Sequence, residues 1–206
     1  MEEYILNHLE QEPEYLKILT RKTYLRSING RMVSGHLQGR FLKMICRMIN
    51  PQNVLEIGTF TGYSTLCLAE GVADKSHIDT IEIDDELEDF IRENFKNSPF
   101  DNKITLHIGD ALKIIPKFNK KYDLAFIDGD KRQYIEYFKC VFPIISKGGF
   151  ILIDNTLWNG KVILPLEQGD NQTRSILNFN DFISNNTHIE QVLLPIRDGL
   201  TIISKK

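Results

Sequence analysis

The chain has 206 residues, a formal net charge of −3 and 26% charged residues, so its overall charge gives no reason to expect binding to nucleic acid or an anionic membrane, although a local basic patch stays possible. This length predicts a single domain, residues 1–206, built around one core. The three cysteines are scattered among apolar residues, which indicates reduced thiols and argues against a metal bound through sulfur. With no signal sequence or membrane span in the pattern, we expect a cytoplasmic protein.

Residues 1–50 read as a helical cap that precedes an α/β core at residues 51–206. Helices are expected at 1–10, 14–27 and 38–49, with a break at Pro13. The glycine-rich stretch 29–40 is expected to be a loop beside a ligand cleft or a lid over it, and an ordinary surface connector explains its composition equally well.

From residue 54 onward, short apolar runs alternate with helical patterns. Strands are expected at 54–57, 77–84, 104–108, 122–128, 148–154, 189–194 and 200–204. Helices are expected at 63–69, 85–96, from 131 to Phe142 and at 174–184, with a loop at 156–172. The tight turn Arg197–Gly199 joins the last two strands as a hairpin. This order predicts an α/β fold: a doubly wound, Rossmann-like sheet of about seven strands with an antiparallel C-terminal hairpin and extra N-terminal helices.

The turn from Gly58 to Gly62 follows the first buried strand and precedes a helix, which is where open α/β sheets bind ligands. Its glycine spacing differs from the pattern that binds a pyrophosphate, and an ordinary strand–helix turn would explain it equally well. A second strand ends in Glu82, 24 residues after Gly58, where a carboxylate can accept both hydroxyls of a ribose. Together the two features predict an adenosine-bearing ligand without a diphosphate, whose adenine would meet Asp110 or the backbone of Ala111 after the third strand.

Polar side chains also follow the fourth and fifth strands. Asp128 ends one strand, and Asp154 and Asn155 end the next, so parallel strands would bring them to the same edge of the sheet. Two carboxylates and an amide oxygen form an all-oxygen set suited to Mg²⁺, with Mn²⁺ or Ca²⁺ possible. The alternative is that each aspartate only caps the helix that follows it.

Lys131 begins the helix that follows Asp128, a position that the helix dipole disfavours for a cation. A solvated lysine is the simple interpretation. Near a divalent metal and a positively charged cofactor its pKa would fall, because like charges disfavour the protonated form, and it could then serve as a general base.

Three segments resemble the cation-dependent, S-adenosylmethionine-dependent O-methyltransferases of the catechol and caffeoyl-coenzyme A type. They are residues 55–64 (LEIGTFTGYS), 126–131 (FIDGDK) and 153–160 (IDNTLWNG), and the resemblance extends from about Met32 to the C-terminus. It implies the class I methyltransferase fold. It also implies a homodimer formed through the N-terminal helices.

The resemblance further implies roles for individual residues. The metal ligands would be Asp128, Asp154 and Asn155, and Lys131 would be the catalytic base. The cofactor-binding residues would be Val33, Glu56, Gly58, Thr59, Ser64, Glu82, Asp110, Ala111, Asp128 and Asp130. Asn159 and Trp158 would contact the acceptor. Arg197 stands where the plant caffeoyl enzymes have a small residue, so it would favour an acidic or phosphorylated acceptor or simply face solvent.

The expected function is methyl transfer from S-adenosylmethionine to a hydroxyl of a catechol or vicinal diol, with Mg²⁺ lowering the pKa of that hydroxyl. Two alternatives remain open. One is methylation of a hydroxylated uridine in tRNA, against which the low positive charge argues modestly. The other is a non-catalytic module that binds S-adenosylmethionine.

Overall fold

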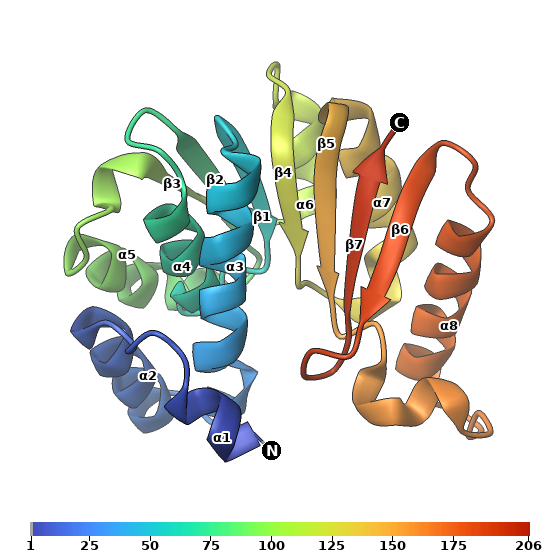
Figure 1. Ribbon diagram of the computed structural model, residues 1–206, viewed down its shortest axis with the longest axis horizontal. Helices are drawn as coiled ribbons and strands as arrows, with labels where there is room; N and C mark the ends of the chain where they lie inside the picture. The colour runs from blue at the N-terminus through green and yellow to red at the C-terminus, as the bar shows by residue number, and fades with distance from the viewer. Residues whose placement is uncertain (1) are drawn as a thin grey trace. The chain divides into compact units, whose positions relative to one another are not determined.

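The computed structural model describes residues 2–206, so Met1, the start of the first predicted helix, lies outside the described residues. Helices and strands alternate through most of the chain (Figure 1). The strands are β1 (Asn53–Ile57), β2 (His77–Glu82), β3 (Ile104–Ile108), β4 (Tyr122–Ile127), β5 (Ile145–Asp154), β6 (Ile189–Leu194) and β7 (Leu200–Lys205). They form a seven-stranded sheet in the order β3-β2-β1-β4-β5-β7-β6. Because β7 is antiparallel to β5 and β6, the sheet is mixed, and the predicted C-terminal hairpin is confirmed.

Eight α-helices are present in the described residues. They are α1 (Glu2–Asn7), α2 (Glu14–Arg26), α3 (Gly35–Ile49), α4 (Tyr63–Gly71), α5 (Glu88–Lys96), α6 (Ala111–Ile114), α7 (Tyr134–Val141) and α8 (Asn171–Ser184). Short 3-10 helices occupy several connections, including Gly30–Met32, Lys131–Gln133 and Trp158–Ile163. The short α6 was not predicted.

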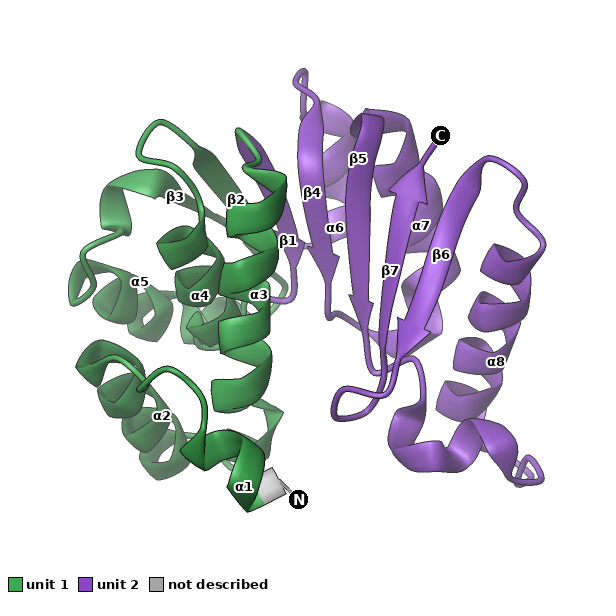
Figure 2. Cartoon of the chain, in the orientation of Figure 1, with its two compact units in different colours: residues 1–52, 59–109 green, residues 53–58, 110–206 purple. Residues whose placement is uncertain are grey.

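The chain divides into two compact units, coloured separately in Figure 2. Unit 1 comprises residues 1–52 and 59–109, and unit 2 comprises residues 53–58 and 110–206. Unit 2 therefore takes β1 from the middle of unit 1's sequence. The single-domain organisation, with a cap ending at residue 50, stays a prediction.

Within unit 1, β2 and β3 are parallel and α3 packs against α4. The helix α4 buries nearly its whole length, from Tyr63 to Ala69, so it is an internal helix rather than an amphipathic surface helix. The residue before α4, its N-cap, is Gly62. Its φ of +93° favours glycine, and a Cβ added there would lie 2.5 Å from the ring of Phe95.

Within unit 2, β1, β4 and β5 are parallel neighbours. Residues Leu124–Ile127 of β4 are fully buried, as expected for a strand that is covered on both faces. The helices α7 and α8 pack against each other, and Phe138 of α7 meets Phe179 of α8 edge to face with ring centroids 6.5 Å apart. This packing positions the ends of β4 and β5.

Several predicted boundaries were wrong. Helix α1 ends at Asn7 rather than Glu10, and α8 begins at Asn171 rather than Arg174. Helix α3 begins at Gly35 rather than Gln38, so it takes in much of the predicted 29–40 loop. Its early turns bury the polar side chains of Gln38 and Arg40, and these hide the hydrophobic periodicity. Strand β5 begins at Ile145 rather than Gly148, because Ile145 pairs with Tyr122 before the register shifts.

None of the helices in the described residues combines the length and the apolar character needed to cross a bilayer.

Candidate active site

The ends of β4 and β5 bring the two predicted metal-binding aspartates to adjacent positions. Ile127 of β4 is paired with Ile153 of β5 in parallel register. Asp128 and Asp154 each come one residue later, on strands that are about 4.8 Å apart. Both carboxylates therefore lie at the same edge of unit 2, and Asn155 follows directly.

Asp128 carries an ion pair with the predicted base. The Lys131 Nζ atom lies 2.6 Å from Asp128 Oδ1, and the two side chains are only 13% and 21% exposed. Lys131 is therefore not the solvated lysine of the simpler interpretation. It opens the 3-10 helix Lys131–Gln133, and its ammonium lies 5.5 Å from the ring centroid of Tyr134.

The alternative that Asp128 and Asp154 cap helices was wrong. The cap of the helix after β4 is Asp130, whose Oδ1 accepts a hydrogen bond from the Arg132 backbone N–H at 3.0 Å. The Arg132 guanidinium also binds Asp130 and holds the pKa of that carboxyl below its usual range. Asp154 instead accepts from the N–H of its neighbour Asn155 at 2.8 Å, and the N-cap of the next helical segment, Trp158–Ile163, is Leu157.

A close backbone approach beside Asp128 explains the need for Gly58. The Asp128 N–H donates to the Ile57 carbonyl at 2.8 Å, and Gly58 has a φ of +96°. A Cβ added to Gly58 would lie 2.2 Å from the Asp128 carbonyl oxygen. Any side chain here would displace the first predicted metal ligand.

The residues at this edge fit a hard divalent cation. They offer two carboxylates and one amide oxygen, the ligand type that Mg²⁺ prefers. Asp154 is only 3% exposed, and a buried carboxylate needs charge compensation. Across residues 2–206 no group of three or more His, Cys, Asp or Glu side chains could hold a metal, and the predicted set itself has only two carboxylates, with Asn155 as its third member.

In unit 1, the carboxylate of Glu82 holds the turn after β1. Its Oε2 accepts a hydrogen bond from the Phe60 backbone N–H at 2.6 Å, and its Oε1 accepts from Ile83 and Asp84 at 2.9 and 3.0 Å. Burial raises the pKa of Glu82, and the three amide hydrogen bonds oppose that shift. Glu82 thus orders the glycine turn in addition to its predicted ribose contact.

The other predicted cofactor residues belong to both units. Unit 1 holds Val33, Thr59 and Ser64, all buried, and the Thr59 hydroxyl hydrogen-bonds that of Thr80 at 2.5 Å. Unit 2 holds Glu56, which is fully buried on β1, together with Asp110 and Ala111. Asp110 caps α6 by accepting from the Leu112 N–H at 3.0 Å. Their roles toward a cofactor stay predictions.

The predicted acceptor residues lie in the loop after β5. Trp158 and Asn159 both have positive φ values, +49° and +52°, and Asn159 is exposed. The Asp198 carbonyl accepts from the N–H groups of Leu157 and Trp158 at 2.7 and 3.0 Å. The β6–β7 hairpin therefore braces this loop, and Arg197 is exposed at its tip.

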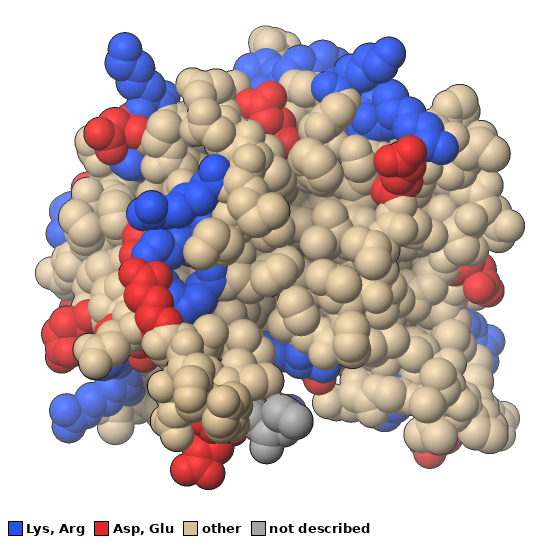
Figure 3. All heavy atoms as spheres, viewed as in Figure 1, with Lys and Arg blue, Asp and Glu red and all other residues tan. Residues whose placement is uncertain are grey.

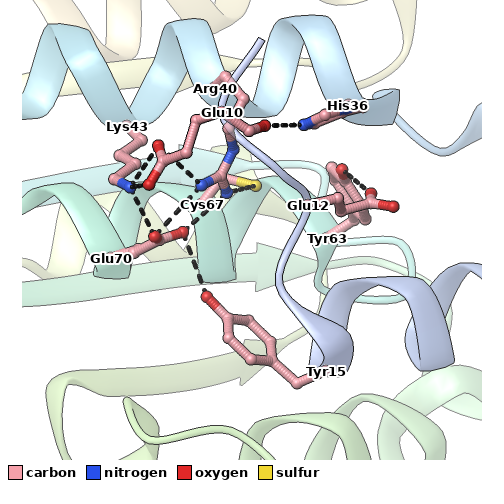
Figure 4. A network of polar contacts seen from close by, with 9 residues as sticks. All are labelled: Glu10, Glu12, Tyr15, His36, Arg40, Lys43, Tyr63, Cys67 and Glu70. Atoms are coloured by element: carbon pink, nitrogen blue, oxygen red, sulfur yellow. Dashed lines mark hydrogen bonds and ion pairs between the residues drawn. The ribbon is translucent and has the colours of Figure 1, made fainter. Parts of the chain in front are cut away.

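Sequence reasoning missed a buried polar cluster in unit 1 (Figure 4). The Glu70 carboxylate on α4 accepts from Arg40 Nη2 and Lys43 Nζ of α3, each at 2.7 Å, and from the Tyr15 hydroxyl at 3.2 Å. Lys43 also binds Glu10, from the segment between α1 and α2, at 2.7 Å. The i,i+3 spacing of the two cations on α3 was the available signal. This cluster attaches the N-terminal segment to α4.

The sheet order and the strand-end carboxylates define a class I methyltransferase fold. The chain belongs to the O-methyltransferase family, whose model matches residues 7–206. It is 32% identical to caffeoyl-CoA O-methyltransferase 2 of Populus trichocarpa over 93% of this chain and 82% of that protein. It is 33% identical to caffeoyl-CoA O-methyltransferase 2 of Petunia hybrida over 93% of this chain and 84% of that protein.

A solved structure agrees with the family assignment. The SAH-bound methyltransferase PaMTH1 of Podospora anserina superposes with a TM-score of 0.91 at 27% identity, over 100% of this chain and 93% of that one. The predicted family and fold are therefore confirmed, and the enzyme is an O-methyltransferase.

Proposed function

We propose that the enzyme transfers a methyl group from S-adenosylmethionine to one hydroxyl of a catechol-like small molecule and that it needs a divalent cation, Mg²⁺ or else Mn²⁺ or Ca²⁺. The observation that carries this proposal is the pair Asp128 and Asp154 at adjacent strand ends, with Lys131 on Asp128. The caffeoyl-CoA relatives and the SAH-bound relative support the acceptor class and the cofactor.

Each residue would have a distinct task. Asp128, Asp154 and Asn155 would hold the cation, which when bound lowers the pKa of the acceptor hydroxyl. Lys131 would take the hydroxyl proton at Nζ. In the structure that nitrogen donates to Asp128, so it becomes a base only after the ion pair opens and it loses its own proton.

Cofactor and acceptor would be held by separate groups. Glu82 would accept the ribose hydroxyls, and Gly58, Thr59 and Ser64 would line the methionine end, while Asn159 and Trp158 would orient the acceptor. Holding both reactants in register supplies much of the rate in such a transfer.

A methyl-transfer assay with a simple catechol, S-adenosylmethionine and Mg²⁺, with and without EDTA, tests the proposal. We expect turnover that EDTA abolishes and that added Mg²⁺ restores. EDTA-resistant turnover would refute the cation requirement. Binding of S-adenosylmethionine without methylation of any diphenol would favour the binding-module alternative.

The tRNA alternative needs a basic surface near the site. Figure 3 shows Lys and Arg along the upper border, on the left beside Asp and Glu, and in smaller groups at the lower left and lower middle, with uncharged residues over most of the rest of this face. Lys121 and Lys205 of unit 2 bind backbone carbonyls of Pro143 and Phe142, at the strand ends opposite Asp128. These lysines therefore give no reason to place RNA at the site. The methyl-transfer assay tests this alternative directly, with tRNA as the second acceptor.

We also propose a homodimer formed through the N-terminal helices and a cytoplasmic location. Support for the dimer comes from large apolar side chains that are exposed on unit 1: Tyr24, Leu25 and Ile28 near the end of α2, and Met44 and Met48 on α3. Sedimentation of the unmodified chain and of Leu25→Glu tests it. We expect a dimer that the charge converts to monomer, and a monomeric unmodified chain would refute it.

A further inference from the structure

Two helices hold the end of β5. The residues concerned are the last residue of the strand, Asp154, and the two that follow it, Asn155 and Thr156. The Tyr134 hydroxyl of α7 donates to the Asp154 carbonyl at 2.9 Å. The Asn180 Nδ2 atom of α8 donates to the Thr156 carbonyl, also at 2.9 Å. Between these two carbonyls lies Asn155 with a φ of +59°, a left-handed conformation that is uncommon for non-glycine residues and that Asn adopts more readily than most.

The two donors are fixed relative to each other. Tyr134 is 1% exposed, and its ring meets Phe179 edge to face at 5.6 Å between centroids. Phe179 is fully buried and directly precedes Asn180 on α8. A third contact, from the Thr201 hydroxyl of β7 to the Thr156 hydroxyl at 2.9 Å, secures the same turn.

The two polar atoms of the Asn180 side chain differ in their contacts. Its Oδ1 atom is buried and has no hydrogen-bond partner among the described residues, whereas its Nδ2 has the single bond to Thr156. An unpartnered buried oxygen is unfavourable, and a leucine of similar size would avoid that penalty. The described contact of this amide is therefore its Nδ2 bond to the turn after β5.

Tyr134 also contacts the proposed base. The Lys131 ammonium lies over its ring, and the same ammonium is bound to Asp128. One rigid side chain thus touches Lys131 through its ring and the backbone of Asp154 through its hydroxyl.

We propose that Tyr134 and Asn180 are positioning residues that fix the left-handed turn at Asn155, so that Asp154 and Asn155 present their oxygens to one cation, with Tyr134 also placing Lys131 beside Asp128. This inference rests on the proposed cation-dependent function. Groups that orient metal ligands typically change metal affinity by roughly 10–100-fold when they are removed.

The test measures Mn²⁺ binding to the metal-free protein by electron paramagnetic resonance, without substrate, for Tyr134→Phe and Asn180→Leu. Each variant loses one donor and keeps its bulk. We expect each to bind Mn²⁺ roughly 10-fold more weakly or worse. Tyr122→Phe is the matched control, because it removes a buried hydroxyl at the start of β4, six residues before Asp128, and should leave Mn²⁺ affinity unchanged.

A second measurement separates positioning from folding. Asn180→Leu removes the unpartnered oxygen but also leaves the buried Thr156 carbonyl without its donor. Because these effects oppose each other, its Tm should stay close to that of the unmodified chain while amide exchange at residues 155–157 rises. Weakened Mn²⁺ binding with unchanged Tm supports the inference. If both variants bind Mn²⁺ with unchanged affinity while Asp154→Ala abolishes binding, this inference is refuted and the proposed cation site is not. Absence of Mn²⁺ binding by the unmodified chain refutes the proposed cation site and this inference together.

Discussion

Glu82 offers the most direct test of the cofactor site, through the substitution Glu82→Gln. The carboxylate is 7% exposed and accepts three backbone N–H groups, one on Oε2 and two on Oε1. Glutamine keeps one acceptor oxygen, so the Phe60 N–H loses its partner while Ile83 and Asp84 keep theirs. Losing a hydrogen bond to a charged group costs about 1.5–3 kcal/mol. Removing the charge also relieves the burial penalty that raises the pKa of Glu82, so we expect the free energy of unfolding to fall by less than this amount.

Cofactor affinity should fall as well. A carboxylate can accept both ribose hydroxyls, and an amide can accept only with its oxygen. Loss of one charged hydrogen bond of about 1.5–3 kcal/mol corresponds to binding that is roughly 10–150-fold weaker. Urea unfolding measures the first effect, and calorimetric titration with S-adenosylmethionine measures the second.

The matched control is Glu93→Gln, which removes an exposed carboxylate of unit 1 paired with Lys22 and Arg26. It should leave cofactor affinity unchanged. If Glu82→Gln binds S-adenosylmethionine as tightly as the unmodified chain, Glu82 is not the ribose ligand.

The pH dependence has a defined sign. Burial raises the pKa of Glu82 above the ordinary 4.5, so the stability contributed by its proton is complete below pH 4.5 and is lost as the pH rises through the folded-state pKa. Cofactor affinity changes in the opposite direction, because only the ionised carboxylate accepts two hydroxyls. Affinity should therefore fall as the pH is lowered through that raised pKa, and Glu82→Gln should lack this fall.

Three further substitutions probe other parts of the chain. Asp154→Ala should abolish cation-dependent turnover in the methyl-transfer assay and leave S-adenosylmethionine affinity nearly unchanged; equal loss of both would contradict the division of roles. Lys131→Met should lower kcat far more than it raises KM for the acceptor, and a fully active variant would remove Lys131 as the base. Glu70→Gln should lower the free energy of unfolding by about 3–5 kcal/mol, because Arg40 and Lys43 stay buried with one charge unbalanced. Adding Lys43→Met should recover part of that loss in urea unfolding, and no recovery would show that the two charges are not coupled.

The candidate site residues that lie at the ends of strands could be predicted from the sequence. Asp128 and Asp154 each end an apolar run, and parallel strands deliver such residues to one edge whatever the details of packing. Gly58 and Glu82 were found in the same way, as strand-end residues at a turn. The physical reason is that strand periodicity and direction are local properties of the chain.

Only the tertiary structure decided how those residues are held. Tyr134 and Asn180 carry no pattern of their own, since a buried tyrosine and a helical asparagine acquire a role only when α7 and α8 pack beside the end of β5. The same holds for Asp130, which took the capping role considered for Asp128. The sequence alone determined which groups reach the sheet edge, because that follows from local periodicity. Packing between distant segments determined the hydrogen-bond partners and the orientation of these groups, because both depend on contacts that no local pattern encodes.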